Sequence, residues 1–274
     1  MVFHRISEEC HLWLQKQPNV KEESLTDWIL YTISERTDKF YYRAFTRNEE
    51  ATNGADWEWW VLVDNYQGFC AYRFLVQAKK LKKDQDNYPL IAYGNRNGLQ
   101  IDLLIDSAKH RDAMPIYIYY SVAVPEIMQQ INNFDFIDKG TVTWCKNCIN
   151  GAYMSMAQSV KKKIFDSPRK KITEVDLLNN SLGLSMCDLL FDSKYSPKQV
   201  MDSLNQYYAN KNIEDNTSVS PNGVYGIMHF ENSIPNYLNT LINQNKALPD
   251  WYESEYKYHL GDIAGVAVVD LRKR

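Results

Sequence analysis

The chain has 274 residues, 45% of them hydrophobic, so it can bury a sizeable core as one elaborated domain or as two small ones. A net charge of −3 excludes a generally basic nucleic-acid-binding protein, so any such contact must come from local patches. No run of about 18 apolar residues is present, and the first residues lack the apolar stretch of a secretory signal, so we expect no membrane segment. The five cysteines are irregularly spaced, which favours reduced thiols and a cytoplasmic location.

Helical and extended patterns alternate through the first half of the chain. Residues 8–17 predict a short helix, and residues 22–36 predict an amphipathic helix with acids in its first turn. A hairpin turn is expected at residues 65–68, between two aromatic-rich stretches. The predicted order is a helix, three strands, a helix and a strand, at residues 22–36, 40–47, 56–64, 69–78, 97–111 and 115–124.

The patterns are weaker after residue 125. They predict helices at residues 151–165, 198–209 and 235–244, a loop at residues 210–222, and strands at residues 182–191 and 263–271. No clean linker is visible. We therefore expect an α/β protein of the α+β kind, in which residues 1–125 form a core and residues 126–274 form a mixed α/β elaboration packed on it.

The candidate site comes from two neighbouring predicted strands. Side chains alternate along a strand, so Asp56 and Glu58 share one face, while Gln77 and Lys79 share a face of the next strand. A hairpin would place Asp56 beside Gln77. A carboxylate, an amide oxygen and the Ala78 carbonyl are hard ligands that suit Mg²⁺ or Mn²⁺. A lysine beside such an ion can orient water and stabilise charge that develops on a phosphate.

An acid followed about twenty residues later by Gln-x-Lys resembles the PD-(D/E)XK nuclease superfamily. The Val76–Lys79 segment is similar to Mrr-type restriction endonucleases, in which Gln replaces the usual acid, and the helix–three strands–helix–strand order resembles the restriction-endonuclease-like core. Together with the segments at residues 22–27, 54–60 and 115–117, these motifs resemble more closely an uncharacterised bacterial family of unknown function, which brings no activity with it.

The superfamily resemblance implies roles for particular residues. Its metal-binding Asp falls on Asp56, its acid-or-Gln ligand on Gln77 and its lysine on Lys79. Many members add an acid from the first helix, which here is Glu23, with Glu22 as the alternative. Ala55 stands where Pro is usual, and the neutral Gln77 makes a third acid necessary, from Glu23, Glu50 or Glu58.

Other polar residues admit a structural interpretation beside a functional one. Four of them could contact the metal ligands without binding the metal themselves: Glu22, Glu50, Glu58 and Gln100. Acids and amides are also common at helix starts and on solvated faces for structural reasons. Two runs of lysines could contact the phosphate backbone of DNA, although such runs are also common on solvated faces. They are Lys80, Lys82 and Lys83, and Lys161, Lys162 and Lys163. Cys145 and Cys148 form a single CxxC without the two further ligands of a zinc site.

Two functional hypotheses remain. The first is a Mg²⁺- or Mn²⁺-dependent DNA endonuclease of restriction or anti-phage type, with Asp56, Gln77, Lys79 and Glu23 in the active site and, by analogy, a homodimer as the working form. The second is a weakly active or inactive module of the same fold that binds nucleic acid or a nucleotide signal within a defence complex.

Overall fold

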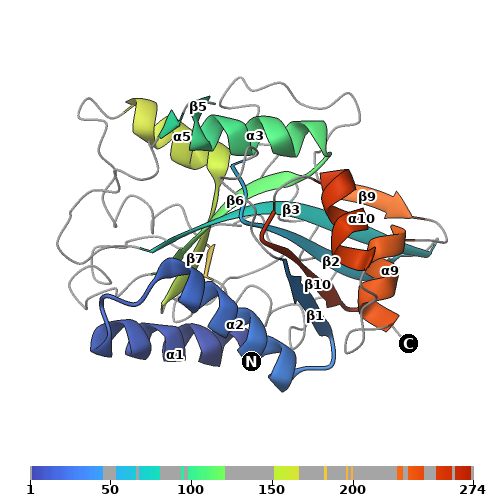
Figure 1. Cartoon of the computed structure of the whole chain (residues 1–274), viewed down its shortest axis with the longest axis horizontal. Coiled ribbons are helices and arrows are strands. Elements are labelled where there is room, and N and C mark those ends of the chain that lie inside the picture. Colours follow the sequence, from blue (N-terminus) through green and yellow to red (C-terminus); the bar gives the residue numbers. More distant parts are fainter. Residues whose placement is uncertain are drawn as a thin grey trace.

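A mixed β-sheet forms the middle layer of the protein, with helices on both faces (Figure 1). The computed structural model describes residues 2–45, 54–65, 68–80, 94–95, 98–120, 151–166, 182–183, 196, 199, 227–230, 234–243, 251–260 and 263–272. Within these residues the strand order is β1 (Phe40–Ala44), β10 (Gly265–Asp270), β2 (Trp57–Asn65), β3 (Gly68–Lys80), β6 (Met114–Tyr120), β7 (Ala152–Met156) and β8 (Leu182–Gly183), and β9 (Ile227–Phe230) pairs with residues 69–72 of β3.

One face of the sheet is covered by α1 (Val2–Lys16) and α2 (Glu22–Arg36). Phe3, Ile6, Cys10 and Leu14 recur at helical spacing along α1 and are buried against the sheet. This stripe explains why the first helix begins at Val2, whereas the sequence predicted residues 8–17. Trp57 and Trp59 of β2 point into the same layer, as strand alternation predicted.

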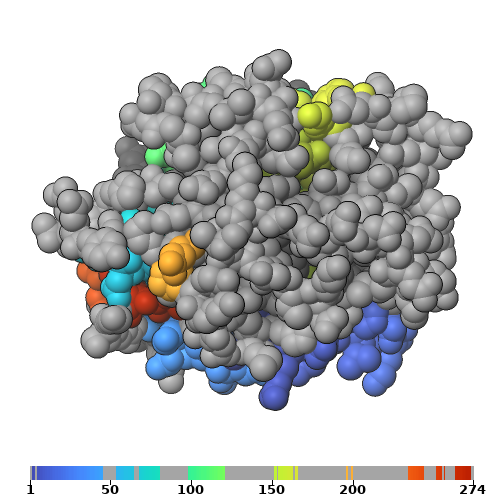
Figure 2. All heavy atoms as spheres, turned by 180° about the vertical axis from the view of Figure 1, so that it is seen from behind, coloured from blue at the N-terminus to red at the C-terminus, as the bar shows by residue number. Residues whose placement is uncertain are grey.

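The other face is covered by α3 (Gln100–His110), α5 (Ala157–Asp166), α9 (Asn236–Asn243) and α10 (Trp251–Leu260). Each buries apolar side chains in one cluster with residues of the sheet such as Trp60, Leu75 and Tyr117. Seen from behind, the blue α1–α2 layer lies along the bottom of the molecule and the yellow-green residues of α5 lie near its top (Figure 2). A two-stranded ladder, β4 (Gly94–Asn95) with β5 (Gly98–Leu99), precedes α3.

The predicted helix–three strands–helix–strand order is present as α2, β1, β2, β3, α3 and β6. The helix predicted at residues 151–165 is wrong in its first part, because residues 152–156 form β7, which pairs antiparallel with β6. Strand pairing there overrides the helical preference of Ala and Met. Of residues 182–191 only β8 is described, and the predictions for residues 198–209 and 210–222 fall almost entirely outside the described part of the chain.

The C-terminal strand β10 lies inside the sheet. It pairs parallel with β2 and antiparallel with β1, so it separates two strands that are neighbours in sequence. Gly265 allows this close packing, because a Cβ at that position would lie 2.3 Å from the Trp57 ring and 2.4 Å from the Arg43 carbonyl oxygen. The α/β class is therefore established, and residues from both ends of the chain build one sheet.

Candidate metal and phosphodiester site

Asp56 lies directly before β2, and Gln77, Ala78 and Lys79 lie near the end of β3. The antiparallel register pairs Trp57 with Val76, and the Asp56 N–H donates to the Val76 carbonyl over 2.8 Å, so Asp56 lies opposite Gln77. The Asp56 carbonyl accepts a hydrogen bond from the Ala264 N–H over 2.6 Å. The backbone of Asp56 is therefore hydrogen-bonded to two neighbouring segments. The bond to Val76 follows from the predicted hairpin, whereas the bond to Ala264 was not predicted.

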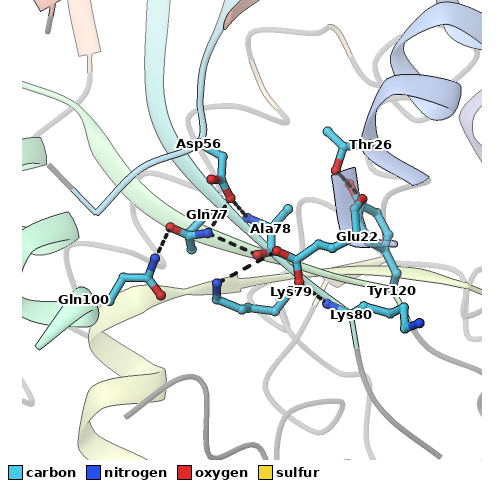
Figure 3. A network of polar contacts seen from close by, with 9 residues as sticks. All are labelled: Glu22, Thr26, Asp56, Gln77, Ala78, Lys79, Lys80, Gln100 and Tyr120. Carbon is cyan, nitrogen blue, oxygen red and sulfur yellow. Dashed lines mark hydrogen bonds and ion pairs between the residues drawn. The ribbon is translucent and has the colours of Figure 1, made fainter. Parts of the chain in front are cut away.

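The Asp56 carboxylate is the centre of a polar network (Figure 3). Its Oδ2 accepts hydrogen bonds from the Ala78 N–H, over 3.0 Å, and from Nε2 of Gln77. The same Gln77 nitrogen also donates to the Ala78 carbonyl over 3.1 Å, and Gln100 Nε2 donates to Gln77 Oε1 over 2.9 Å. Asp56, Gln77 and Ala78 thus come together as the sequence predicted, and Gln100 contacts Gln77 from the start of α3.

Glu22 approaches the same strand end from α2. Its Oε2 accepts the Lys80 backbone N–H over 2.5 Å, and its Oε1 lies 3.9 Å from Nζ of Lys79. Burial raises the pKa of Glu22 from its ordinary value of 4.5 to about 7, although the Lys79 ammonium and the Lys80 N–H both favour the charged form. Glu22, the alternative to Glu23 in the sequence prediction, is thus the acid that reaches β3, while Glu23 is exposed.

A pocket of about 210 Å³ opens beside this network. Asp56, Trp57, Ala78, Phe45 and Ala264 are among the residues that line it. The charged side chains among its described lining residues are all acidic: Glu22, Glu23, Asp27 and Asp56. This concentration of negative charge favours a cation, because each carboxylate attracts it and a metal ion relieves their mutual repulsion.

The donor set fits a hard divalent cation. The described residues contain no cluster of three or more His, Cys, Asp or Glu that could hold a metal with side chains alone. However, Asp56 Oδ2 and the Ala78 carbonyl oxygen both lie within hydrogen-bonding reach of one nitrogen of Gln77, so two hard oxygens already converge on a single point. Carboxylate and carbonyl oxygens are the ligands that Mg²⁺ and Mn²⁺ prefer, completed by water.

Glu58 belongs to a different network. Its side chain is fully buried on the α9–α10 face, where Oε1 accepts from Nε of Arg73 over 2.6 Å. Oε2 accepts from the hydroxyls of Tyr256, over 2.8 Å, and Tyr237, over 3.2 Å. The carboxylate therefore ties the two C-terminal helices to the sheet, and it is engaged there rather than at Asp56.

The predicted phosphate-binding lysines are only partly within the described residues. Lys80 Nζ donates to the carbonyls of Pro18 and Val20 in the turn between α1 and α2. Lys161 forms an ion pair of 2.8 Å with Asp102 of α3, and Lys162 is exposed on α5. The side chain of Lys163 lies outside the described part of the chain. The same holds for the whole of five other residues: Glu50, Lys82, Lys83, Cys145 and Cys148.

Sequence reasoning did not identify several residues around the site. The Thr26 and Tyr120 hydroxyls are hydrogen-bonded to each other over 2.8 Å, and the Thr26 hydroxyl lies 3.2 Å from the Glu22 carbonyl oxygen. Thr26 follows Glu22 by one helical turn, so the i, i+4 spacing could have indicated it. Nothing local indicates Ala264, which reaches the pocket because β10 inserts beside β2.

The buried Glu22 predicts a pH dependence. We expect the free energy of unfolding of metal-free protein to fall, relative to Glu22→Gln, as the pH rises from about 4.5 to about 7. The unfolded chain loses this proton near pH 4.5, whereas the folded protein keeps it to about pH 7, so raising the pH between these values favours unfolding. The difference reaches at most about 3 kcal/mol. Urea titrations in EDTA measure it, and a difference that does not vary with pH would contradict it.

Gly54 holds the segment before Asp56 against α3. Its φ is 72°, and a Cβ there would lie 2.6 Å from both the Gln100 carbonyl oxygen and the Leu104 nitrogen. We expect Gly54→Ala to lower the free energy of unfolding by about 2–3 kcal/mol. Gly98→Ala is the matched control, because Gly98 has a φ of 123° but open space around it. Equal losses in chemical denaturation would show that contact with α3 is not the cause.

Comparisons with known proteins give a family but no activity. A family model described as "Family of unknown function (DUF6615)" matches residues 1–274. No curated protein and no solved structure matches the chain. In the part of the chain that the structure describes, no helix is both long enough and apolar enough to cross a membrane.

Proposed function

We propose that the chain, which belongs to the DUF6615 family, is a metal-dependent endonuclease that hydrolyses phosphodiester bonds of DNA at the Asp56 site. The observation that carries the proposal is that Asp56 Oδ2 and the Ala78 carbonyl oxygen both face the amide nitrogen of Gln77. Lys79 is the next residue of the same strand. The α2–β1–β2–β3–α3–β6 order, which resembles the restriction-endonuclease-like core, supports it.

The residues of the site have distinct tasks in this proposal. Asp56 and Ala78 hold the cation, and Glu22 adds a second carboxylate from across the pocket. A bound Mg²⁺ or Mn²⁺ lowers the pKa of a water molecule and neutralises phosphate charge. Lys79 contributes a positive charge beside the scissile phosphate, where it orients the attacking water and stabilises the charge of the transition state. Because each chain contributes one such site, cutting both strands together calls for a homodimer on DNA.

The acidic pocket decides how DNA can approach. The carboxylates of Glu23 and Asp27 repel a phosphate in the absence of a cation, and Glu22 adds to this repulsion once the pH exceeds its pKa of about 7. A divalent ion held by Asp56 would offset part of this negative charge and would offer the phosphate oxygens a cation to coordinate. Binding of DNA near the site is therefore expected to depend on the metal as well as on ionic strength.

DNA cleavage tests this function. Purified protein is incubated with supercoiled plasmid and linear duplex in Mg²⁺, Mn²⁺ or EDTA, beside Asp56→Ala. The proposal expects nicked and linear products with a metal ion, none in EDTA and none with Asp56→Ala. Absence of products from the wild-type protein with either metal would overturn the proposal.

One observation favours a second function, a catalytically weak module that binds nucleic acid or a nucleotide. The Gln77 amide nitrogen, which is a neutral donor, already links Asp56 to the Ala78 carbonyl. If that nitrogen fills the cation position permanently, binding of DNA or nucleotide is metal-independent and is unchanged by Asp56→Ala. Fluorescence anisotropy with labelled DNA in EDTA and in Mg²⁺ separates the two functions.

A further inference from the structure

The side chain of Gln77 is held at both ends of its amide group. Nε2 donates to Asp56 Oδ2 and to the Ala78 carbonyl, and Oε1 accepts from Nε2 of Gln100 over 2.9 Å. Gln77 is only 2% exposed, so water has little access to replace these partners. The orientation of the amide is therefore fixed by its hydrogen bonds, since a half-turn would bring Oε1 against two acceptor oxygens.

This orientation is the opposite of the one that binds metal. An amide nitrogen has no lone pair to offer a cation, so only Oε1 of Gln77 can be a ligand. In the structure Oε1 points to α3, and Nε2 points to the two oxygens on which a cation would be held (Figure 3). For Gln77 to join the ligand set, its amide must make a half-turn that exchanges the two atoms.

Gln100 determines what that half-turn costs. After it, Nε2 of Gln77 faces Nε2 of Gln100, and two donors oppose each other. Gln100 can accommodate the change by turning its own amide and presenting Oε1. A side chain at position 100 that only donates cannot do so, and one that only accepts favours the turned state.

Resting on the proposed metal-dependent function, we propose that Gln100 is a positioning residue that sets the orientation of the Gln77 amide and thereby the affinity of the Asp56 site for Mg²⁺ or Mn²⁺. The two glutamines form a pair whose amides turn together: one arrangement is metal-free, and the other offers Gln77 Oε1 to the ion. A purely structural Gln100, which only begins α3, would affect stability but not the metal affinity.

Mn²⁺ binding without DNA tests this by isothermal titration calorimetry. The variants are Gln100→Glu, which only accepts when ionised, Gln100→Lys, which only donates, and Gln100→Met, which does neither. Each variant is made twice, once with Gln77 present and once with Gln77→Met. The charge introduced at position 100 acts on the metal in both backgrounds, but the Gln77 amide is present only in the first, so the difference between them reports the effect that passes through Gln77. Thermal melting in EDTA shows that each variant is folded.

We expect Gln100→Glu to raise the affinity for Mn²⁺ in both backgrounds. The increase is expected to be roughly tenfold larger when Gln77 is present than in the Gln77→Met background. Gln100→Lys is expected to weaken binding beyond its effect in that background by a similar factor. Equal shifts in the two backgrounds, with Mn²⁺ bound by the wild-type protein, would overturn the role of Gln100 and leave the proposed function intact. Absence of Mn²⁺ binding in the wild-type protein and in Gln100→Glu alike would overturn both.

Discussion

Replacing Lys79 with methionine is expected to lower the rate of metal-dependent DNA cleavage at saturating metal by about 10²–10³-fold. The ammonium lies 3.9 Å from Glu22 Oε1, and its side chain is only 13% exposed, so it acts at short range in a site with limited solvent. Loss of one preorganised charge at a developing anion costs a factor of this size, because the charge stabilises the transition state more than the bound substrate.

The measurement is single-turnover cleavage of a labelled duplex in Mg²⁺. Lys16→Met is a matched control, because Lys16 is an exposed lysine at the end of α1. Lys79→Arg keeps the positive charge but replaces a compact ammonium with a planar fork, so a partial loss is expected. Cleavage by Lys79→Met at the wild-type rate would exclude a chemical role for Lys79.

The buried ion pair between Glu58 and Arg73 predicts the largest loss of stability. Arg73 donates to Glu58 over 2.6 Å and to the Arg111 carbonyl over 2.6 Å, and its guanidinium lies 5.2 Å from the centre of the Trp60 ring. We expect Arg73→Met to lower the free energy of unfolding by about 3–5 kcal/mol, because it leaves a fully buried carboxylate without its countercharge.

A second substitution tests this cause. Adding Glu58→Gln to Arg73→Met removes the uncompensated charge while leaving an acceptor for the hydroxyls of Tyr237 and Tyr256. The double variant is therefore expected to be more stable than Arg73→Met alone in chemical denaturation. If the double variant is less stable than both single variants, the loss comes from packing instead of charge.

The sequence was sufficient to place Asp56 beside Gln77. The pairing of β2 with β3 continues to Asn65 and Gly68, so its register is determined by residues close in sequence. A one-residue slip would move Trp57 and Trp59 out of their buried layer. The helix with acids in its first turn and the order of elements up to β6 were predictable for the same reason, because each depends on periodicity within one segment.

Other features depend on contacts between distant segments. The position of β10 between β1 and β2 joins residues more than 200 positions apart, and no pattern within residues 263–271 indicates its neighbours. Glu58 was predicted on the face of Asp56, but its partners on α9 and α10 come from the far end of the chain. The choice between Glu22 and Glu23 depends on how α2 rotates against β3, which periodicity alone does not fix.

The most direct test of the Asp56 site is anomalous diffraction from a crystal of the wild-type protein grown with Mn²⁺. We expect a peak about 2.0–2.3 Å from an Asp56 carboxylate oxygen and from the Ala78 carbonyl oxygen, with the Gln77 amide turned so that Oε1 faces it. A crystal at saturating Mn²⁺ in which Gln77 Nε2 still links Asp56 to Ala78, with no peak at that position, would contradict the account.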